Sequence, residues 1–307
     1  MTRGFTGLLT LAPEVERALI RSQPVVALET SIVAHGLPHP YGLQAALRCE
    51  QRVREAGGVP ATIAVLDGSV RVGLEESELE LLGTADRVRK VAPRDLGTAV
   101  VSGEPGATTV AGTLAVCRIA GIHFMATGGI GGVHRGWQES RDVSADLYEI
   151  AFAAVCVVCS GVKSLLDVGS TLEELETRGI PVVGYGTDRF PLFYERESEH
   201  GLPDRVEDAA TVAALAATHW GFARTSGVIV AQPVAEEAAL RADEIRPAIE
   251  RALADAAAHG VRGADVTPFV LGRVHELTNG RSLEANVRLV EDNAALAAEI
   301  AAAYYAE

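Results

Sequence analysis

The sequence predicts an α/β protein in which helices pack on both sides of a largely parallel sheet. Short apolar runs rich in β-branched residues alternate with segments of helical periodicity along most of the 307 residues. The apolar runs are continuous, as expected of strands that are buried on both faces. No Pro- or Ser-rich linker, charge block or internal repeat divides the chain. We therefore predict a single domain over residues 1–307.

Six apolar runs predict the strands of this sheet, and five helical stretches lie between them. The strands are expected at Val25–Glu29, Ala61–Leu66, Ile122–Thr127, Val155–Cys159, Pro181–Tyr185 and Val228–Ala231. The helices are expected at Leu43–Glu55, Thr108–Ile119, Ala145–Ala153, Thr171–Arg178 and Ala209–Thr218. In such sheets the ligand site lies beyond the carboxyl ends of the strands, so functional residues are expected there.

The chain from residue 235 onward has a mostly helical pattern. Helices are expected at Glu236–His259, Pro268–Leu277 and Leu283–Tyr304. Gly260 and Gly280 punctuate this tail as helix-ending or turn residues.

Charge and composition exclude several classes of function. The chain carries 41 Asp and Glu against 27 Lys and Arg, a net charge of −14, whereas general nucleic-acid binders present basic surfaces. No apolar run reaches the roughly 18 residues of a membrane span, and the apolar stretch near the N-terminus is too short for a signal peptide. Four cysteines in a chain of this length do not make a disulfide framework. We therefore expect a soluble, cytoplasmic protein.

Only two of the 27 basic residues are lysines, Lys90 and Lys163. A bias towards arginine codons explains why lysine is rare, but not the two positions where it remains. Arginine stays protonated, whereas a lysine amine can lose its proton and act as a nucleophile. Both lysines are therefore candidates for chemistry that arginine cannot perform. Lys90 begins a cationic loop, residues 90–95, for which anion binding and a plain surface charge are the alternatives.

Glu29 ends the first predicted strand and is a candidate general acid or base. Burial at the end of an apolar strand would raise the pKa of its carboxyl towards neutrality. The alternative is a salt-bridged carboxylate on the surface. Further along, His35 and His39 lie in a turn with Gly36 and Pro38, which is a weak pattern for metal binding.

Thr127 ends another predicted strand and opens a glycine-rich segment, residues 127–136. Glycines let backbone N–H groups surround an anion, and His134 or Arg135 would add charge. The spacing matches neither the dinucleotide-binding fingerprint nor a P-loop. A flexible turn is the alternative, but the position after a strand favours phosphate binding.

Asp142, Ser144 and Asp146 form a polar motif before a predicted helix. Leu147 and Tyr148 follow where a calcium loop needs glycine, which excludes an EF-hand. The motif could hold a divalent ion that keeps several waters. It is also typical of a helix N-cap, formed by Ser144 or Asp142.

Lys163 lies just beyond the strand Val155–Cys159. Loss of solvation there would lower the pKa of its amine and favour nucleophilic attack. Cys156 and Cys159 have the spacing of a redox pair, but residues three apart on a strand point to opposite faces. Both cysteines are therefore predicted to be core residues.

Eight blocks, spread over nearly the whole chain, indicate one family. They are Ala27–Pro40, Gly57–Gly68, Gly106–Thr113, Ala126–Gly136, Asp142–Leu147, Cys159–Asp167, Pro181–Tyr194 and Gly280–Ala301. With ATGGIGGVHRG, DVSADL and CSGVKSLLD among these blocks, the chain resembles the pseudouridine-5′-phosphate glycosidases, also called the indigoidine synthase A family. The resemblance implies a three-layer α/β/α sandwich and a homotrimer.

Enzymes of that family make or break a C–C bond between C1′ of ribose 5-phosphate and a planar base. The resemblance implies that Glu29 is the proton donor, that Lys163 is the nucleophile, and that Asp142 binds Mn²⁺ or another divalent cation. Substrate contacts are implied at Lys90, Val110, Thr127, His134, Ser144, Ala145, Asp146 and Asn286.

A lysine nucleophile suits this bond because a C-glycoside has no leaving-group oxygen to protonate. A neutral lysine instead attacks C1′ of the ring-opened sugar and holds it as an iminium, an electron sink for the C–C bond. Glu29 would move the proton that ring opening and carbon protonation need. Lys90 and the glycine-rich segment would hold the phosphate so that C1′ lies against Lys163.

Two amide-bearing positions of the family pattern are changed here. Tyr41-Gly42 stand where the family has Gln-Asn, and Gln232 begins a segment where it has Asn-Pro-Ile-Pro. Loss of the amide at Gly42 would leave more room and one hydrogen bond fewer on the base side. We therefore expect a larger planar acceptor, as in antibiotic biosynthesis of the alnumycin type, where ribose 5-phosphate is joined to an aromatic polyketide. The alternative is pseudouridine-5′-phosphate glycosidase chemistry with uracil.

Two other functions fit the same residues. A Schiff-base aldolase for a sugar phosphate would also use Lys163, and only its products would differ. A non-catalytic sugar-phosphate-binding protein would bind ribose 5-phosphate without forming a covalent adduct.

Overall fold

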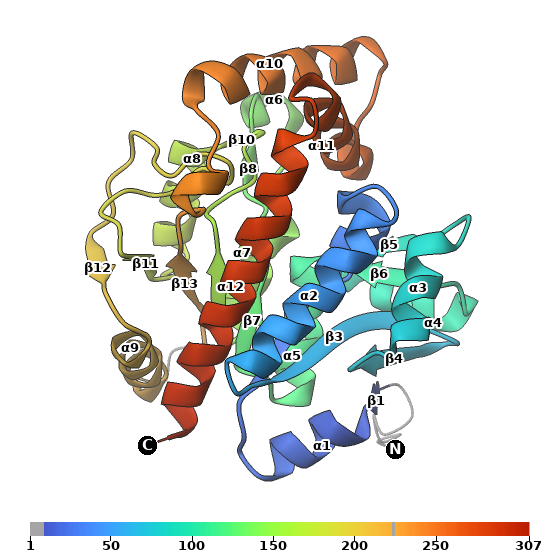
Figure 1. Ribbon diagram of the computed structural model, residues 1–307, viewed down its shortest axis with the longest axis vertical. Helices are drawn as coiled ribbons and strands as arrows, with labels where there is room; N and C mark the ends of the chain where they lie inside the picture. The colour runs from blue at the N-terminus through green and yellow to red at the C-terminus, as the bar shows by residue number, and fades with distance from the viewer. Residues whose placement is uncertain (1–8, 223–224, 307) are drawn as a thin grey trace.

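The computed structural model describes residues 9–222 and 225–306, which form a sheet of eleven strands with helices on both faces (Figure 1). The strands are β1 (Leu9–Leu11), β2 (Val25–Leu28), β3 (Val59–Leu66), β4 (Ser69–Val72), β5 (Arg89–Val91), β6 (Gly106–Thr108), β7 (Phe124–Ala126), β9 (Cys156–Cys159), β11 (Val182–Tyr185), β12 (Asp204–Val206) and β13 (Val228–Ala231). Their order is β1-β4-β3-β2-β7-β9-β13-β11-β12, and β6 pairs with β3 and β5. All six predicted strands are present, shortened or extended by up to two residues at their ends.

The sheet is mixed but largely parallel, as predicted. Only β4 and β6 run antiparallel to their neighbour β3 among the pairs within this sheet. Two short segments, β8 (Val133–His134) and β10 (Leu166–Asp167), form a separate antiparallel pair. That pair joins the segments that follow β7 and β9, the two strands at the centre of the sheet.

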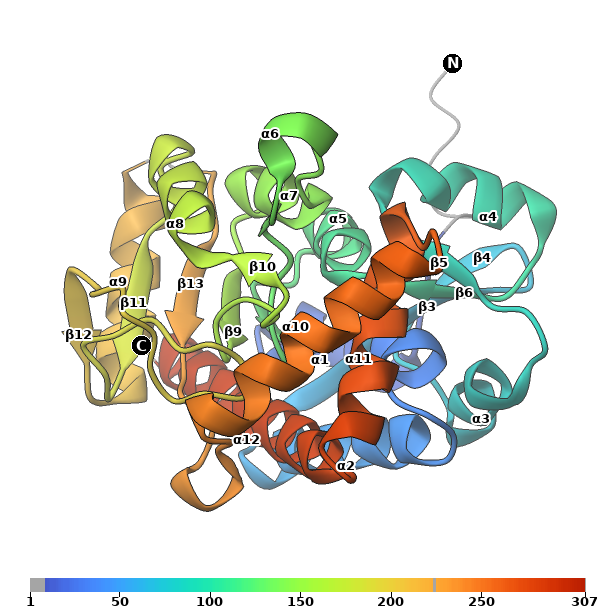
Figure 2. The ribbon, with the colours of Figure 1, turned by 90° about the horizontal axis from the view of Figure 1, so that it is seen from above.

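Helices form the two outer layers. They are α1 (Pro13–Ile20), α2 (Tyr41–Glu55), α3 (Glu76–Thr84), α4 (Leu96–Ser102), α5 (Val110–Ala120), α6 (Trp137–Ser140), α7 (Ala145–Phe152), α8 (Val168–Thr177), α9 (Ala209–Gly221), α10 (Ala242–Ala258), α11 (Val266–Leu277) and α12 (Arg281–Tyr305). Figure 2 shows α2 and α12 on one face of the sheet and α5, α7 and α8 on the other. The helices α10 and α11 lie across the edge where the central strands end (Figures 1 and 2). This arrangement confirms the predicted α/β/α sandwich.

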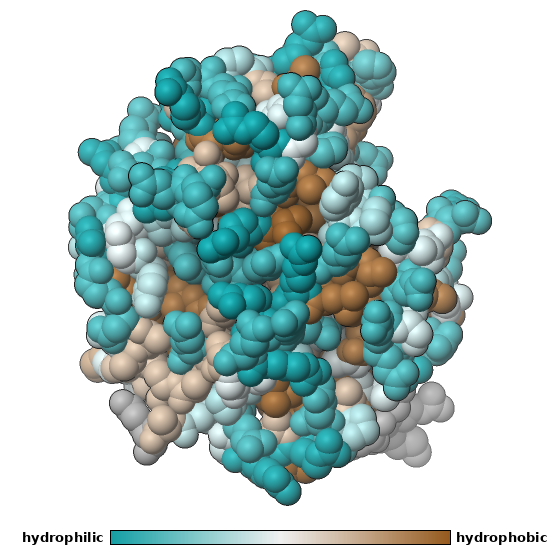
Figure 3. Space-filling model, viewed as in Figure 1, coloured by the Kyte–Doolittle hydropathy of each residue, from teal (hydrophilic) through white to brown (hydrophobic). Residues whose placement is uncertain are grey.

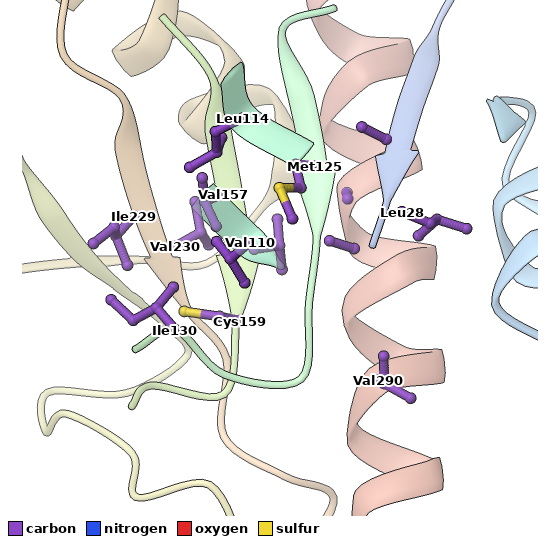
Figure 4. Packing of buried hydrophobic residues seen from close by; sticks show 14 of the residues in the cluster. Leu28, Val110, Leu114, Met125, Ile130, Val157, Cys159, Ile229, Val230 and Val290 are labelled. Carbon is purple, nitrogen blue, oxygen red and sulfur yellow. The ribbon is translucent and has the colours of Figure 1, made fainter. Parts of the chain in front are cut away.

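The core lies where both layers press on the central strands. Met125, Val157 and Val230 come from three neighbouring strands and are fully buried, with Leu114 of α5 and Val290 of α12 in the same cluster (Figure 4). Such burial on both faces explains why these strands are continuous apolar runs. The face that carries α2 and α12 is largely hydrophilic, with apolar side chains visible between the helices (Figure 3). Across the described ranges, no helix has both the length and the apolar character of a membrane span.

Lys90 lies in a strand and not in the predicted loop. β5 pairs in parallel with β6, and Lys90 stands opposite Ala107 in the register. A strand of three residues is too short to show a hydrophobic period, so only its pairing partner reveals it.

The helical segment from residue 235 onward contains one more break than the sequence predicted. The expected helix Glu236–His259 is divided into a 3₁₀ turn, Glu236–Ala238, and α10. Between them Leu240 is buried, and its N–H donates to the carbonyl of Tyr194 at 2.9 Å, which holds the backbone out of the helix. Gly260 and Gly280 have φ of +67° and +88°, as expected of turn residues beside helix ends.

Candidate active site

A cavity of about 1190 Å³ opens at the carboxyl ends of β2, β7 and β9. Ten of the eleven residues implied by the resemblance line it: Glu29, Lys90, Thr127, His134, Asp142, Ser144, Ala145, Asp146, Lys163 and Asn286. The eleventh, Val110, is 1% exposed, and its side chain packs in the core (Figure 4). Side chains from distant parts of the sequence thus meet where the sheet topology predicts a ligand site.

Glu29 is held between two strand ends. It follows β2 directly, one carboxylate oxygen accepts a hydrogen bond from the Ser31 hydroxyl, and the other accepts one from the Thr127 hydroxyl, which follows β7. Glu29 therefore lies in the cavity wall with two hydroxyl partners, and not on the outer surface as the alternative assumed. The two hydroxyls fix the carboxylate at the cavity wall.

Lys163 lies in a tight turn after β9 that runs beside the glycine-rich segment. Its backbone N–H donates to the carbonyl of Ile130 at 3.1 Å, and the N–H of Ile130 donates to Gly161 at 3.1 Å. Gly161 has φ +79°, and a Cβ there would lie 2.0 Å from the carbonyl oxygen of Pro191, so only glycine fits. Further along, β8 and β10 place His134 opposite Leu166. The two segments that carry Lys163 and His134 are therefore joined by backbone hydrogen bonds.

The glycines of residues 127–136 serve close packing. A Cβ on Gly131 would lie 2.2 Å from the Ser144 hydroxyl, and one on Gly132 would lie 2.4 Å from the Thr171 hydroxyl. The N–H groups of Ile130, Gly131 and Val133 already donate to protein acceptors. These three amides therefore do not form the anion cradle that the glycine pattern predicted.

Asp146 joins two elements of the cavity wall. Its carboxylate is 5% exposed and accepts hydrogen bonds from the N–H of Ala111, in the first turn of α5, at 2.9 Å and from the N–H of Gly131 at 2.7 Å. The Ser144 hydroxyl accepts from the Asp146 N–H at 3.2 Å and caps α7. Ser144 is therefore the N-cap, and the alternative that Asp142 caps this helix is wrong.

Lys90 and His134, both in the cavity wall, have pKa values below those usual for their side chains. Burial, and then the nearby Lys163 ammonium, lower the pKa of Lys90 below the usual value for lysine. Burial also lowers the pKa of His134, against the effect of Asp142, which raises it. The two lysines, Lys90 and Lys163, lie in one cavity and suit an anionic ligand.

Asp142 offers a single carboxylate to a cation. The nearest titratable partner is His134, whose Nδ1 lies 3.9 Å from the Asp142 carboxylate. Within the described ranges no three His, Cys, Asp or Glu residues come together as a metal-binding group. The residues present suit a divalent ion that has one protein carboxylate and keeps most of its waters.

Several residues of the cavity were not anticipated from the sequence. They are Ser31, Thr109 and Phe193, together with Arg262 before α11 and other residues of α10 and α11. Asn293 lies behind the wall, where its amide donates to the Thr127 carbonyl at 2.8 Å and to the Ser160 hydroxyl at 3.1 Å. The signal that could have found Asn293 is its spacing of seven from Asn286, which puts two amides on the otherwise largely apolar buried face of α12.

The predicted acceptor-side residues do not line the cavity. Tyr41 and Gly42 begin α2, and Gln232 follows β13; none of the three is among the residues of the cavity wall. A Cβ on Gly42 would lie 2.8 Å from the carbonyl oxygens of Ile32 and Val33. Glycine at this position therefore allows two backbone segments to approach, and it does not enlarge the acceptor side.

Cys156 and Cys159 are free and fully buried, as predicted for core residues. Burial raises the pKa of both thiols to about 12. Neither thiol is a redox centre at neutral pH, because the thiolate is the reactive form.

Comparison with known proteins gives consistent matches along the chain. The model of the family "Indigoidine synthase A like protein" matches residues 14–303. A pseudouridine-5′-phosphate glycosidase of Deinococcus radiodurans is 52% identical over 96% of this chain and 95% of its own length. A protein of the same name from Nocardioides sp. is 52% identical over 97% of both.

Two solved structures are similar throughout. The prealnumycin C-glycosynthase AlnA, in complex with ribulose 5-phosphate, has a TM-score of 0.89 and 36% identity over 97% of both chains. An indigoidine synthase A-like protein of Thermotoga maritima has a TM-score of 0.87 and 37% identity, covering 96% of this chain and 95% of that one.

Proposed function

The chain belongs to the indigoidine synthase A-like family, and on that premise we propose that it is a pseudouridine-5′-phosphate glycosidase. It is an enzyme of the C-glycosidase type. Its substrate is proposed to be pseudouridine 5′-phosphate. Cleavage of the C1′–C5 bond of this substrate gives ribose 5-phosphate and uracil, and the reverse reaction joins these two products. The observation that carries the proposal is the placement of Glu29 and Lys163 on one cavity wall.

The choice of uracil over a polyketide acceptor rests on the degree of similarity. Proteins named for the pseudouridine reaction are 52% identical, whereas the C-glycosynthase is 36% identical. The sequence argument for a larger acceptor used Gly42 and Gln232, which lie outside the cavity wall. We therefore rank the alnumycin-type reaction second.

The proposed cleavage begins with the bond between C1′ and the ring oxygen. Glu29 gives its proton to the ring oxygen while the Lys163 amine bonds to C1′, and the carboxylate then takes a proton from the new ammonium. The C–C bond breaks as the nitrogen lone pair forms an iminium with C1′, and Glu29 protonates C5 of the base. Water hydrolyses the iminium and releases ribose 5-phosphate, which restores the amine.

The phosphate is proposed to bind where two helices begin. Val110 and Ala145 are the first residues of α5 and α7, and the amides of first-turn residues have no acceptor within their helix. Thr109 and Ser144, the two N-caps, both line the cavity, and Lys90 lines it as well. Helix N-termini favour phosphate, so Val110 would contact substrate through its backbone although its side chain is buried.

A divalent cation, Mn²⁺ or another, is proposed at Asp142. When bound it would add positive charge and ordered water near the sugar phosphate. Removal with a chelator should weaken substrate binding, and addition of Mn²⁺ should restore it. Calorimetric titration of the wild type and of Asp142→Asn with Mn²⁺ measures metal affinity independently of activity. Equal affinity of the two proteins for Mn²⁺ would disprove the metal site at Asp142.

A homotrimer is proposed for the assembly, and one face of the protein supports contact with a second copy. Ile119, Tyr148 and Phe152 on α5 and α7 are 55%, 55% and 48% exposed. Beside them, Glu149 is buried, and its Oε2 has no hydrogen-bond partner in the described chain. Light scattering should give three copies for the wild type and a smaller species for Phe152→Glu; a monomeric wild type would reject the trimer.

Uracil release tests the function directly. The protein is incubated with pseudouridine 5′-phosphate, free uracil is measured by chromatography, and Lys163→Met is the control. Rapid release by the wild type alone supports the proposal. No release, together with transfer of ribose 5-phosphate to an aromatic polyketide, would favour the second candidate. Other products from ribose 5-phosphate would indicate an aldolase, and the absence of any covalent adduct a binding protein.

A further inference from the structure

His35 lies in the cavity wall close to the candidate catalytic residues. It is part of a five-residue π-helix, Ile32–Gly36, that begins three residues after Glu29. The N–H of Leu37 donates to the carbonyl of Ile32 at 3.1 Å, which closes the wide turn. Turns of this kind are rare and occur often at functional sites, because they turn a side chain out of the ordinary helical register.

One ring nitrogen of His35 is unpaired within the described residues. Nε2 is shielded from solvent and has no hydrogen-bond partner in the described chain. The ring lies beside the backbone of Arg89, which favours its protonated form. In the neutral ring Nε2 is either a donor or an acceptor, and here neither role is used within the described chain.

The imidazole is neutral in this position. Burial, and then the nearby Lys90 ammonium, lower the pKa of His35, against the Arg89 backbone and the more distant Asp265, which raise it. A buried ring nitrogen with no hydrogen-bond partner is unusual in a native structure, and a bound ligand would supply one.

The neighbourhood of His35 indicates what that partner is. Lys90, proposed to bind the sugar phosphate, lies next to His35 in the wall. α11 packs over the π-helix, and Gly263 and Val266 at its start also line the cavity (Figure 2). A ligand held by Lys90 would therefore reach His35 between the π-helix and the start of α11.

Gly42 keeps the π-helix in this place. The carbonyl oxygens of Ile32 and Val33 lie 2.8 Å from where a Cβ of Gly42 would be. A larger residue at position 42 would have to push the π-helix, and His35 with it, because both obstacles are backbone atoms.

We propose that His35 is a further substrate-binding residue, whose Nε2 forms a hydrogen bond with a hydroxyl of the sugar phosphate once the start of α11 shifts to admit it. The inference rests on the proposed function for the identity of the sugar, ribose 5-phosphate. The sugar is favoured over the base because Lys90 is the neighbour of His35.

Covalent trapping with ribose 5-phosphate tests this step without uracil. Borohydride reduces the iminium on Lys163, and intact mass gives the fraction trapped at each sugar concentration. His35→Leu should need about tenfold more ribose 5-phosphate for half-maximal trapping, the loss expected for one neutral hydrogen bond. His35→Gln, which keeps a hydrogen-bonding group, should recover part of the loss. His39→Leu, an exposed neighbour outside the cavity wall, is the matched control and should trap as the wild type does.

Three outcomes would overturn the proposal, and a fourth would overturn only the proposed function. Wild-type trapping by folded His35→Leu, with its thermal midpoint unchanged, would show that His35 does not contact the sugar. Normal trapping but lost uracil release would assign His35 to the base. An equal loss in His35→Leu and His35→Gln, with a lower thermal midpoint, would show a purely structural role. A wild type that traps ribose 5-phosphate but releases no uracil would disprove the proposed function while the trapping comparison stands.

Gly42→Ala provides a second variant. Its Cβ should displace the π-helix and raise the ribose 5-phosphate concentration for half-maximal trapping in the same direction as His35→Leu. Combined with His35→Leu it should add little, because both changes remove the same contact. Full additivity of the two losses would contradict the link between Gly42 and His35.

Discussion

The two walls of the cavity are built in different ways. The inner wall, formed by the strand ends after β2, β7 and β9 and by the starts of α5 and α7, holds its polar groups by hydrogen bonds, as in Glu29 with Ser31 and Thr127. The outer wall is formed by α10, α11 and the chain between them. Its lining is largely apolar, with Leu253, Val261, Val266, Pro268 and Leu271.

The two walls also differ in the interactions that hold them to the rest of the protein. Asp146 of the inner wall is buried and accepts two backbone hydrogen bonds. α10 of the outer wall is tied to the body by ion pairs of different exposure. Arg135–Glu250, 3.0 Å, joins side chains that are 46% and 71% exposed, whereas Arg246–Glu195, 2.9 Å, joins an exposed arginine to a buried carboxylate. Exposed pairs contribute little free energy, whereas buried charge-assisted hydrogen bonds contribute more. The inner wall is thus suited to fix reacting groups by hydrogen bonds, whereas the outer wall presents a largely apolar surface to the ligand.

The largest effect is expected at Lys163. Lys163→Arg keeps a positive charge but removes the nucleophile, so kcat should fall by about 10³-fold or more. The thermal midpoint should change little, because the side chain lines a cavity. Uracil release and thermal unfolding measure the two quantities. Substantial remaining activity would exclude the covalent mechanism.

Asp146→Asn should disrupt the hydrogen bonds that hold the inner wall, while Lys163 itself is unchanged. An amide can accept from only one of Ala111 and Gly131 and presents N–H to the other, so stability should fall by about 2–3 kcal/mol and kcat/KM by about 10–100-fold. Asp208→Asn is the matched control, since Asp208 also accepts a backbone amide but lies far from the cavity, at the start of α9. Its activity should equal that of the wild type. Equal losses of activity in both variants would refute a positioning role for Asp146.

Lys90→Arg should weaken binding more than chemistry. The planar guanidinium replaces a compact ammonium, so KM should rise by about tenfold with kcat less affected. The pH profile separates the two side chains. Because the pKa of Lys90 is lowered, the wild-type KM should rise as pH increases through that lowered value and the ammonium loses its charge. The variant stays charged, and its KM should be flat there; parallel profiles would show that Lys90 does not bind the phosphate.

The smallest effect is expected at the outer wall. Glu250→Gln removes an exposed ion pair with Arg135, so stability should change by less than about 1 kcal/mol and kcat/KM by less than about threefold. Steady-state kinetics and urea unfolding are the measurements. A tenfold loss of kcat/KM would mean that the outer wall is as rigidly required as the inner one, and the contrast between the walls would fail.

The sequence predicted the layers well because the central strands are buried on both faces. Val228–Ala231 is an uninterrupted apolar run, and its predicted bounds match β13. Short pieces such as β5 and the 3₁₀ turn before α10 were missed, because their conformation depends on a partner: β6 in one instance and the Tyr194 carbonyl in the other.

The candidate site was predicted as a set of residues but not as an arrangement. The resemblance found Glu29 and Lys163, and the structure brings both to one cavity. The resemblance could not show that the Asp146 carboxylate accepts hydrogen bonds from two backbone N–H groups. Nor could it show that Gly42 is needed for a close approach of two backbone segments. These facts depend on atoms from segments that are distant in sequence, and no local pattern carries them.

The position of α12 has a consequence for how the protein is made. Asn286 faces the cavity from this helix, and Asn293 braces the carbonyl after β7 and the hydroxyl after β9. During translation the reactive lysine emerges more than a hundred residues before residues 281–305 do. A ribosome-bound chain therefore carries its nucleophile for some time without the brace that orders the surrounding turns. Premature stop codons between residues 164 and 281 should yield products that contain both lysines yet lack a working centre.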